Sequence, residues 1–177
     1  MNILIVDDDK IIVDAIESTI NWSDLGIEEI YRAYNVDMAE RVLESHLVHI
    51  VVSDIEMPGN TGLELLKWYR EKGYDGEFLL LTCHENFSYA ADALRMQATE
   101  YLLKPFDREQ LEAALKKCVL RIRERYKSKK YEEYGVWAAD NHIELQRSIL
   151  VKLLTQPFDE SYFDRNEKLI HGASGLN

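Results

Sequence analysis

The chain has 177 residues, enough for one full domain and an appendage. Hydrophobic residues make up 46% of it, an ordinary share for a globular protein, and no apolar run is long enough to span a bilayer. The net charge of −11 argues against a chain that grips nucleic acid by itself. The charge is uneven, because residues 1–106 carry 8 basic and 20 acidic groups, whereas residues 107–130 carry 9 basic and 4 acidic groups.

The number and spacing of the cysteines indicate whether the protein is expected in a reducing or an oxidising cellular compartment. Cys83 and Cys118 lie far apart and match no metal-ligand spacing, so we expect reduced thiols and no disulfide framework. The N-terminal residues begin as a strand rather than as a signal segment. A cytoplasmic protein without membrane contact is the expectation.

Apolar runs bounded by turn residues predict buried strands, and apolar residues at helical spacing predict helices between them. We expect strands over residues 2–6, 28–33, 49–54, 78–82 and 100–103. We expect helices over residues 10–20, 37–47, 62–69, 86–96 and from 108 onward, with residues 22–27 as a loop. Asp9 and Asp107 are the expected N-caps of their helices.

Strand and helix alternate five times with short connections. Parallel strands need crossovers, and right-handed crossovers place helices on both faces of the sheet. The sequence therefore predicts an α/β fold with a parallel sheet. Beyond residue 125 the apolar spacing suggests more helix, interrupted near Gly135 and stopped at Pro157.

The predicted strands end in chemically active residues. Asp7 and Asp8 follow the first strand, Asp54 ends the third, and Thr82 and Lys104 end the fourth and fifth. Clustered carboxylates repel one another and need a cation, and oxygen ligands of this kind suit Mg²⁺. A lysine and a hydroxyl facing the metal suit the oxygens of a phosphoryl group. The set predicts a phosphoryl-transfer site in which one carboxylate is the nucleophile.

Several separated motifs, in this order, give the chain a family likeness. Together they resemble the receiver domain of two-component response regulators over roughly residues 1–125. The fold this implies is flavodoxin-like, a doubly wound sheet with strand order 2-1-3-4-5. The motifs are residues 3–8, residues 54–59 with residues 62–65, residues 81–82 and residues 101–106.

The resemblance implies a role for each matching residue. Asp54 is the expected phosphoacceptor, and a sensor histidine kinase is the expected donor. Asp8, Asp54 and the backbone carbonyl of Glu56 are the expected Mg²⁺ ligands, with Asp7 helping through water. Lys104 is expected to pair with the phosphoryl group and to form a cis peptide with Pro105. Thr82 is the expected switch hydroxyl, which moves toward the phosphoryl group. Tyr101 is either the aromatic side chain that turns inward behind it or a half-buried aromatic of the strand.

The chain departs from the family pattern at two places. Asp9 stands where Glu is usual, and Cys83 follows Thr82 where Ser, Ala or Gly is common. Glu56 and His84 flank the site and Cys83 can alter its loop, so we expect these side chains to tune the lifetime of the phosphorylated form. The alternative for His84 is a surface histidine without a role in the site.

Two further stretches, residues 20–27 and 86–94, resemble receivers coupled to AraC-type helix-turn-helix output domains. No recognition helix is evident after residue 130, so we expect residues 126–177 to be a helical extension toward an output domain, and DNA binding only through that domain. We also expect a homodimer on phosphorylation. Its face is predicted to include Arg95, Glu100, Arg108 and Lys116. The helix that follows is predicted to continue this face as a dimer seam, with Leu115, Cys118, Ile122, Trp137, Leu145 and Ile149.

Two other readings compete with the receiver. Residues 3–9 also resemble the nucleophile loop of haloacid-dehalogenase-type phosphatases, with Asp7 as nucleophile and Asp9 as acid/base. That reading lacks a later acidic pair to hold the metal, and it leaves the Asp54 stretch without a purpose. The second alternative is a receiver-like interaction module that is never phosphorylated. An incomplete acidic pocket would favour this alternative, but the predicted pocket is complete.

Overall fold

The computed structural model describes residues 1–83 and 87–140. By its internal contacts the chain divides into two units, Met1–Lys127 and Ser128–Asn177. The first unit holds a five-stranded parallel sheet in the order β2-β1-β3-β4-β5, as predicted. The strands are β1 (Asn2–Val6), β2 (Glu29–Ala33), β3 (Ile50–Asp54), β4 (Glu77–Thr82) and β5 (Glu100–Leu103).

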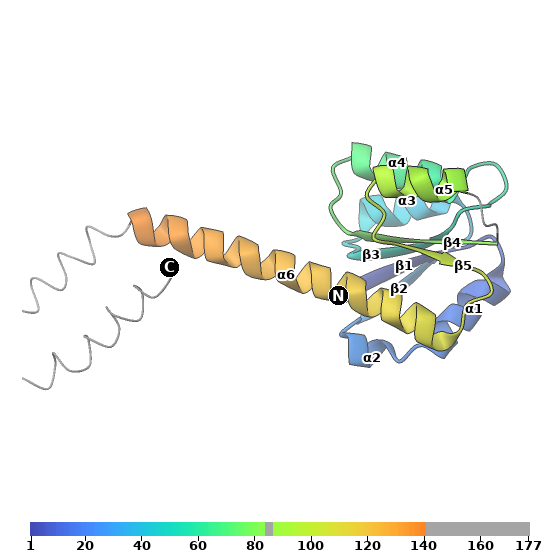
Figure 1. Ribbon diagram of the computed structural model, residues 1–177, viewed down its shortest axis with the longest axis horizontal. Coiled ribbons are helices and arrows are strands. Elements are labelled where there is room, and N and C mark those ends of the chain that lie inside the picture. The colour runs from blue at the N-terminus through green and yellow to red at the C-terminus, as the bar shows by residue number, and fades with distance from the viewer. Residues whose placement is uncertain (84–86, 141–177) are drawn as a thin grey trace, which may run out of the picture. The chain divides into compact units, whose positions relative to one another are not determined.

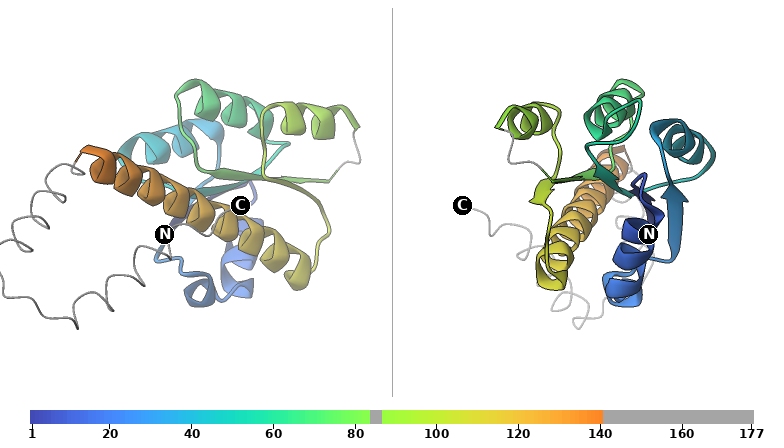
Figure 2. Two further views of the ribbon diagram at one scale, coloured as in Figure 1. Left: turned by 60° about the vertical axis from the view of Figure 1, so that its left-hand side comes forward. Right: turned by 90° about the vertical axis from the view of Figure 1, so that its right-hand side faces the viewer.

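Helices cover both faces of the sheet (Figure 1; Figure 2, right). One face carries α3, α4 and α5, and the other carries α1, α2 and the first turns of α6. The two layers follow from the strands themselves, since β1, β3 and β4 are buried on both faces. The helices are α1 (Lys10–Thr19), α2 (Trp22–Leu25), α3 (Val36–Ser45), α4 (Gly62–Glu71), α5 (Phe87–Arg95) and α6 (Arg108–Asp140).

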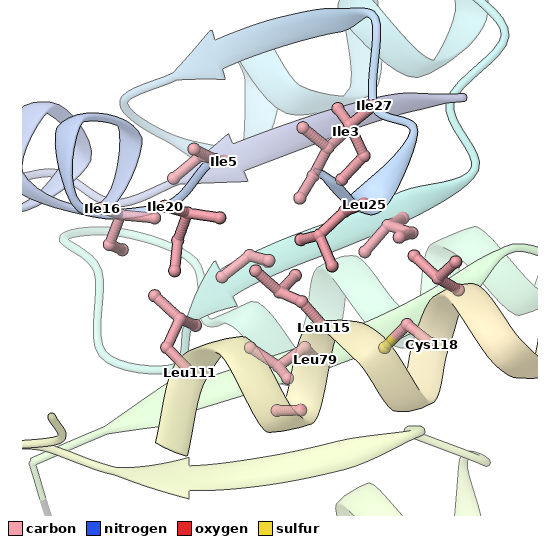
Figure 3. Close-up of a cluster of buried hydrophobic side chains, with 14 of the residues drawn as sticks. Ile3, Ile5, Ile16, Ile20, Leu25, Ile27, Leu79, Leu111, Leu115 and Cys118 are labelled. Atoms are coloured by element: carbon pink, nitrogen blue, oxygen red, sulfur yellow. The ribbon is translucent and has the colours of Figure 1, made fainter. Parts of the chain in front are cut away.

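Helix α6 packs on the sheet through one apolar stripe. Leu111, Leu115 and Cys118 recur at helical spacing and are almost wholly buried. They meet Ile3, Leu79 and other side chains of β1, β3 and β4 (Figure 3). Burial also raises the pKa of the Cys118 thiol to about 12, which keeps it protonated and unreactive.

The region predicted as a loop contains one helical turn, α2, so that prediction was wrong. Leu25 drives the turn by entering the core with 3% of its surface exposed. Trp22 is fixed by its indole N–H, which donates to the carbonyl of Glu17 at 2.7 Å. Gly26 then ends the turn in a left-handed conformation, with φ of 72°. Four residues are too few for a helical period to be visible in the sequence.

The predicted interruption near Gly135 was also wrong, because α6 runs unbroken from Arg108 to Asp140. One glycine inside a helix costs only about 1 kcal/mol relative to alanine, which a helix of this length tolerates. The predicted cap at its start is confirmed. Asp107 accepts a hydrogen bond from the N–H of Gln110 at 2.8 Å, and the Gln110 side chain accepts from the N–H of Asp107 at 3.0 Å.

The cap of α1 is also as predicted, since Asp9 accepts from the N–H of Ile11 at 2.8 Å. The Lys104–Pro105 peptide is cis, as the sequence suggested. Across the ranges that the structure describes, no helix is both long and apolar enough to cross a membrane.

A histidine joins β1 to β3 at the amino ends of the strands. The N–H of Asn2 donates to Nδ1 of His49 at 3.1 Å, so this ring nitrogen must be unprotonated. Burial, together with the positive α-amino group, lowers the pKa of His49 below its ordinary value of 6.5, against an opposing effect of Glu28. The folded state therefore favours the neutral ring more than the unfolded chain does.

We predict that His49 makes stability depend on pH. The lowered pKa means that unfolding takes up a proton, so the contribution is complete above the ordinary pKa of 6.5 and is lost as pH falls below it. Urea unfolding at about pH 7.5 and about pH 5.5 measures the loss. His49→Asn keeps an acceptor near the position of Nδ1 and cannot be protonated there, so its loss should be smaller. Equal losses in both proteins would contradict the assignment.

Candidate functional site

The sheet is parallel, so the carboxyl ends of its strands lie at one edge (Figure 1). Asp7 follows β1 directly, Asp54 is the last residue of β3, and Lys104 follows β5. Asp54 lies opposite Leu81 in the parallel register, so Thr82 at the end of β4 lies beside it. Open α/β sheets form their binding crevices at this edge.

Lys104 connects the two buried carboxylates. Its Nζ lies 2.7 Å from Oδ2 of Asp7 and 2.6 Å from Oδ1 of Asp54. Both carboxylates are buried, and the lysine side chain is 12% exposed. The other oxygen of each carboxylate is also occupied. Oδ1 of Asp7 accepts from the N–H of Asp9 at 2.9 Å, and Oδ2 of Asp54 accepts from the N–H of Glu56 at 2.9 Å.

This burial and pairing act on the protonation of the site. Burial raises the pKa of Asp7 above its ordinary value, although the hydrogen bond from Lys104 opposes it. Burial alone would lower the pKa of Lys104, but its hydrogen bonds to Asp54 and Asp7 outweigh that and raise it. The lysine is therefore firmly cationic at neutral pH.

The backbone around Asp54 is held by a close approach of helix α4. A Cβ on Gly62, the first residue of α4, would lie 2.1 Å from the carbonyl oxygen of Asp54 and 2.8 Å from Oγ of Ser53. The N–H of Gly62 donates to the carbonyl of Ile55 at 2.9 Å, and Ser53 Oγ donates to the Asp54 carbonyl at 2.9 Å. Thr61 and Glu64 form a capping box that starts the helix at this point.

The switch candidates lie on the next two strands. Thr82 is fully buried, and its carbonyl accepts from the N–H of Lys104 at 2.6 Å. Tyr101 is half-buried and packs against the apolar cluster beneath α3, α4 and α5. It lies opposite Leu80 in the register, two residues before the level of Thr82.

The remaining predicted ligands lie at the rim. Asp8 is exposed and Glu56 is half-buried. Within the described residues, no three carboxylate, imidazole or thiol side chains are close enough to form a metal cage. The donor set nevertheless suits a hard divalent ion, because Asp7, Asp8 and Asp54 carry three negative charges and Lys104 neutralises one.

Cys83 and His84 were predicted to tune the lifetime of the phosphorylated form. Cys83 is exposed beside the site, and His84 lies outside the described residues. So do Leu145, Ile149 and the side chain of Trp137 from the predicted dimer seam. The prediction that Leu115, Cys118 and Ile122 belong to this seam was wrong, because they are buried in the core between α6 and the sheet.

The charged residues of the predicted dimer face all pair within the chain. Arg95 lies 3.3 Å from Asp92, while Arg108 and Lys116 lie 3.9 Å and 3.1 Å from Glu112. Glu100 pairs with Lys117 of α6.

The response regulator receiver domain profile matches residues 3–116. The chain belongs to the response regulator receiver domain family. The receiver is 31% identical over 150 residues to the uncharacterized transcriptional regulatory protein YesN of Bacillus subtilis (strain 168). That match covers 80% of this chain and 41% of YesN, so this chain spans less than half the length of that curated relative.

Solved structures agree with the assignment. The receiver domain of AraT, a response regulator from Geobacillus stearothermophilus, is 32% identical with a TM-score of 0.64, and the match covers 71% of this chain and 97% of that one. A two-component transcriptional regulator AraC from Clostridium phytofermentans ISDg is 28% identical with a TM-score of 0.63. That match covers 68% of this chain and 96% of the other.

Sequence reasoning gave no role to Ser53 and Gly62, although they fix the backbone of Asp54. Gly62 belongs to one of the family motifs and stands at the start of a helix, where Gly is not the usual first residue, but neither signal indicated the close approach to Asp54.

We predict that Gly62→Ala lowers the free energy of unfolding by about 1–3 kcal/mol, because its Cβ would overlap the Asp54 carbonyl and force α4 outward. Gly73→Ala is the comparison. Its Cβ meets nothing within 4 Å, and only its left-handed φ of 82° is unfavourable, at about 1 kcal/mol. Urea unfolding of both variants measures the difference. A loss in Gly62→Ala no greater than in Gly73→Ala would mean that α4 moves away from Asp54 without cost.

Proposed function

We propose that Asp54 of this receiver accepts a phosphoryl group from the phosphohistidine of a sensor histidine kinase. The observation that carries the proposal is the buried contact of Asp54 Oδ1 with Lys104 Nζ at 2.6 Å, at a strand end beside Asp7 and Thr82. Receiver domains of response regulators are phosphoacceptor domains, which supports the proposal.

In the proposed transfer, a carboxylate oxygen of Asp54 attacks the phosphorus. The P–O bond forms as the P–N bond breaks, and the kinase histidine keeps the electron pair. Charge on the transferred oxygens is stabilised by the Lys104 ammonium and the Thr82 hydroxyl, which lie at neighbouring strand ends. Asp54 can exchange its ion pair with Lys104 for a phosphoryl contact to the same lysine, so the cation is never left without a partner.

We propose Asp8, Asp54 and the backbone carbonyl of Glu56 as Mg²⁺ ligands, with Asp7 acting through water. Two negative charges remain after Lys104 neutralises one of the three aspartates, which is the charge that Mg²⁺ supplies. When bound, the ion screens the incoming phosphoryl oxygens from the carboxylates.

A phosphatase of the haloacid-dehalogenase type is not favoured, because the family match and the sheet order are those of a receiver. Asp9, the acid/base of that alternative, already caps α1 by accepting from the N–H of Ile11.

The output is proposed from the relatives. AraT and the regulator named AraC support an output domain of the AraC type, and YesN supports control of transcription. Residues 126–177 would then form a helical extension toward that domain, through which alone the protein would contact DNA. A homodimer on phosphorylation and a cytoplasmic location stay predictions. Surface ion pairs are weak, so Arg95 and Lys116 could exchange their partners within the chain for partners across a dimer.

We predict that acetyl phosphate with Mg²⁺ adds one phosphoryl group to the chain, measured by intact mass, and none to Asp54→Ala. Asp9→Asn is the matched control, because asparagine caps a helix as well as aspartate does. It should be labelled like the wild type. Labelling that survives in Asp54→Ala but disappears in Asp7→Ala would favour the phosphatase and overturn the proposal.

We predict that Mg²⁺ stabilises the fold through Asp8. An ion at 100 times its dissociation constant adds about 2.7 kcal/mol by mass action. The melting temperature of the wild type and of Asp9→Asn should rise with millimolar Mg²⁺, whereas that of Asp8→Asn should rise much less. A wild-type melting temperature indifferent to Mg²⁺ would count against the site.

A further inference from the structure

A carboxylate is buried at the opposite end of the sheet from the phosphoacceptor. Glu77 is the first residue of β4 and only 3% of its surface is exposed. Thr82 is the last residue of the same strand. At the usual strand rise, five residues separate the two by about 16 Å. Glu77 has no part in the phosphoryl-transfer site, and a buried glutamate is costly unless it is paired.

Its partners come mainly from α6. Nη2 of Arg125 donates to Oε1 of Glu77, and Nη1 of Arg121 lies 3.6 Å from Oε2. The hydroxyl of Thr99, just before β5, donates to Oε2. Nη1 of Arg125 also donates to the carbonyl of Asp75, just before β4. One carboxylate therefore joins the starts of β4 and β5 to two arginines on successive turns of the helix.

This cluster differs from the other ion pairs of α6 between residues 108 and 127. Arg108 and Lys116 pair with Glu112 inside the helix, which fixes nothing to the sheet. Lys117 does reach Glu100 of β5, but the Glu100 side chain is 25% exposed, against 4% for Glu77. Buried pairs are lost at a much higher cost than exposed ones. Glu77 is thus the most deeply buried carboxylate among the ion pairs that join this part of α6 to the sheet, although its partners Arg125 and Arg121 are 37% and 53% exposed.

We propose that Glu77 is a latch that holds α6 on the sheet and that phosphorylation at the other end of β4 loosens it. The coupling half of the proposal rests on the proposed role of Thr82 as the switch. A strand buried on both faces moves as a unit, because packed interiors deform little. Glu77 moves with β4, whereas Arg121 and Arg125 belong to α6, so a shift of β4 relative to α6 changes the distances between the carboxylate and the two guanidinium groups. Because α6 is one helix from Arg108 to Asp140, a change at Arg121 and Arg125 acts on the helix that leads toward residues 128–140.

Hydrogen exchange of the full chain, with and without beryllofluoride as a phosphoryl mimic, tests the latch. Glu77→Gln keeps an oxygen acceptor for Thr99 and removes the charge that the arginines need. It should speed exchange of the amides of residues 119–127 by at least about tenfold, with those of β1 and β3 changing less than about threefold. Arg125→Met, which removes the exposed partner without placing a new group in the core, should do the same. Glu112→Gln is the matched control and should have no such effect.

In the wild type, beryllofluoride should speed exchange of residues 119–127, and in Glu77→Gln this response should be absent. Unchanged exchange in both variants, or an equal rise in every strand, would overturn the latch. A wild type that responds around residues 55–61 but not at residues 119–127 would overturn the coupling and leave the receiver function intact. If beryllofluoride changes exchange nowhere and acetyl phosphate does not label Asp54, the proposed function is contradicted. The comparison of wild type with Glu77→Gln and Arg125→Met, made without beryllofluoride, would still test the latch.

Discussion

The ammonium of Lys104, held between Asp7 and Asp54, is the interaction on which the phosphoryl-transfer site depends. Two carboxylates at neighbouring strand ends, both more than nine-tenths buried, repel each other and favour protonation. Lys104, at the end of β5, offsets this repulsion by pairing with both carboxylates. The two ion pairs join the carboxyl ends of β1, β3 and β5. The same cation then faces any phosphoryl group that arrives at Asp54. The contact that stabilises the resting fold and the contact that would stabilise the product are therefore made by one side chain.

The position of this lysine is set by the backbone rather than by the lysine itself. The Thr82 carbonyl accepts from the N–H of Lys104, which extends the pairing of β4 and β5 up to the site. On the other side, Gly62 brings α4 against the Asp54 carbonyl at a distance that no side chain permits. Long flexible side chains such as lysine lose much conformational entropy when fixed, and this rigid frame limits how many arrangements are available. The acidic pocket is thus a property of strand register and of one missing Cβ as much as of its charged residues.

The apolar pattern of the sequence predicted the strands and the residues at their ends, because buried strands have a strong apolar signal and end abruptly in polar residues. The order of the strands in the sheet was predicted from the resemblance to receiver domains. The sequence did not predict α2, because a single helical turn is too short to show helical periodicity. Its formation depends on the burial of Leu25 in the core. Sequence reasoning misplaced a break at Gly135, because glycine weakens a helix without necessarily ending it. The sequence pattern could not predict the ionic cluster around Glu77. A glutamate before an apolar run looks like a solvated strand edge, and only the tertiary fold brings Arg121 and Arg125 to it.

Strand β4 places two ionic sites at its two ends, and the physical reason lies in the architecture. In a doubly wound sheet, both faces of the central strands are covered, so polar groups can reach solvent or partners only at the strand ends. Asp54, Thr82 and Lys104 gather at the carboxyl ends, while Glu77 and Thr99 lie at the amino ends of β4 and β5. Helix α6 begins after β5 near the first site and runs back across the sheet to the second, where its arginines meet Glu77. A single helix therefore reaches both ends of the sheet, and β4, which is buried along its whole length, runs directly between them.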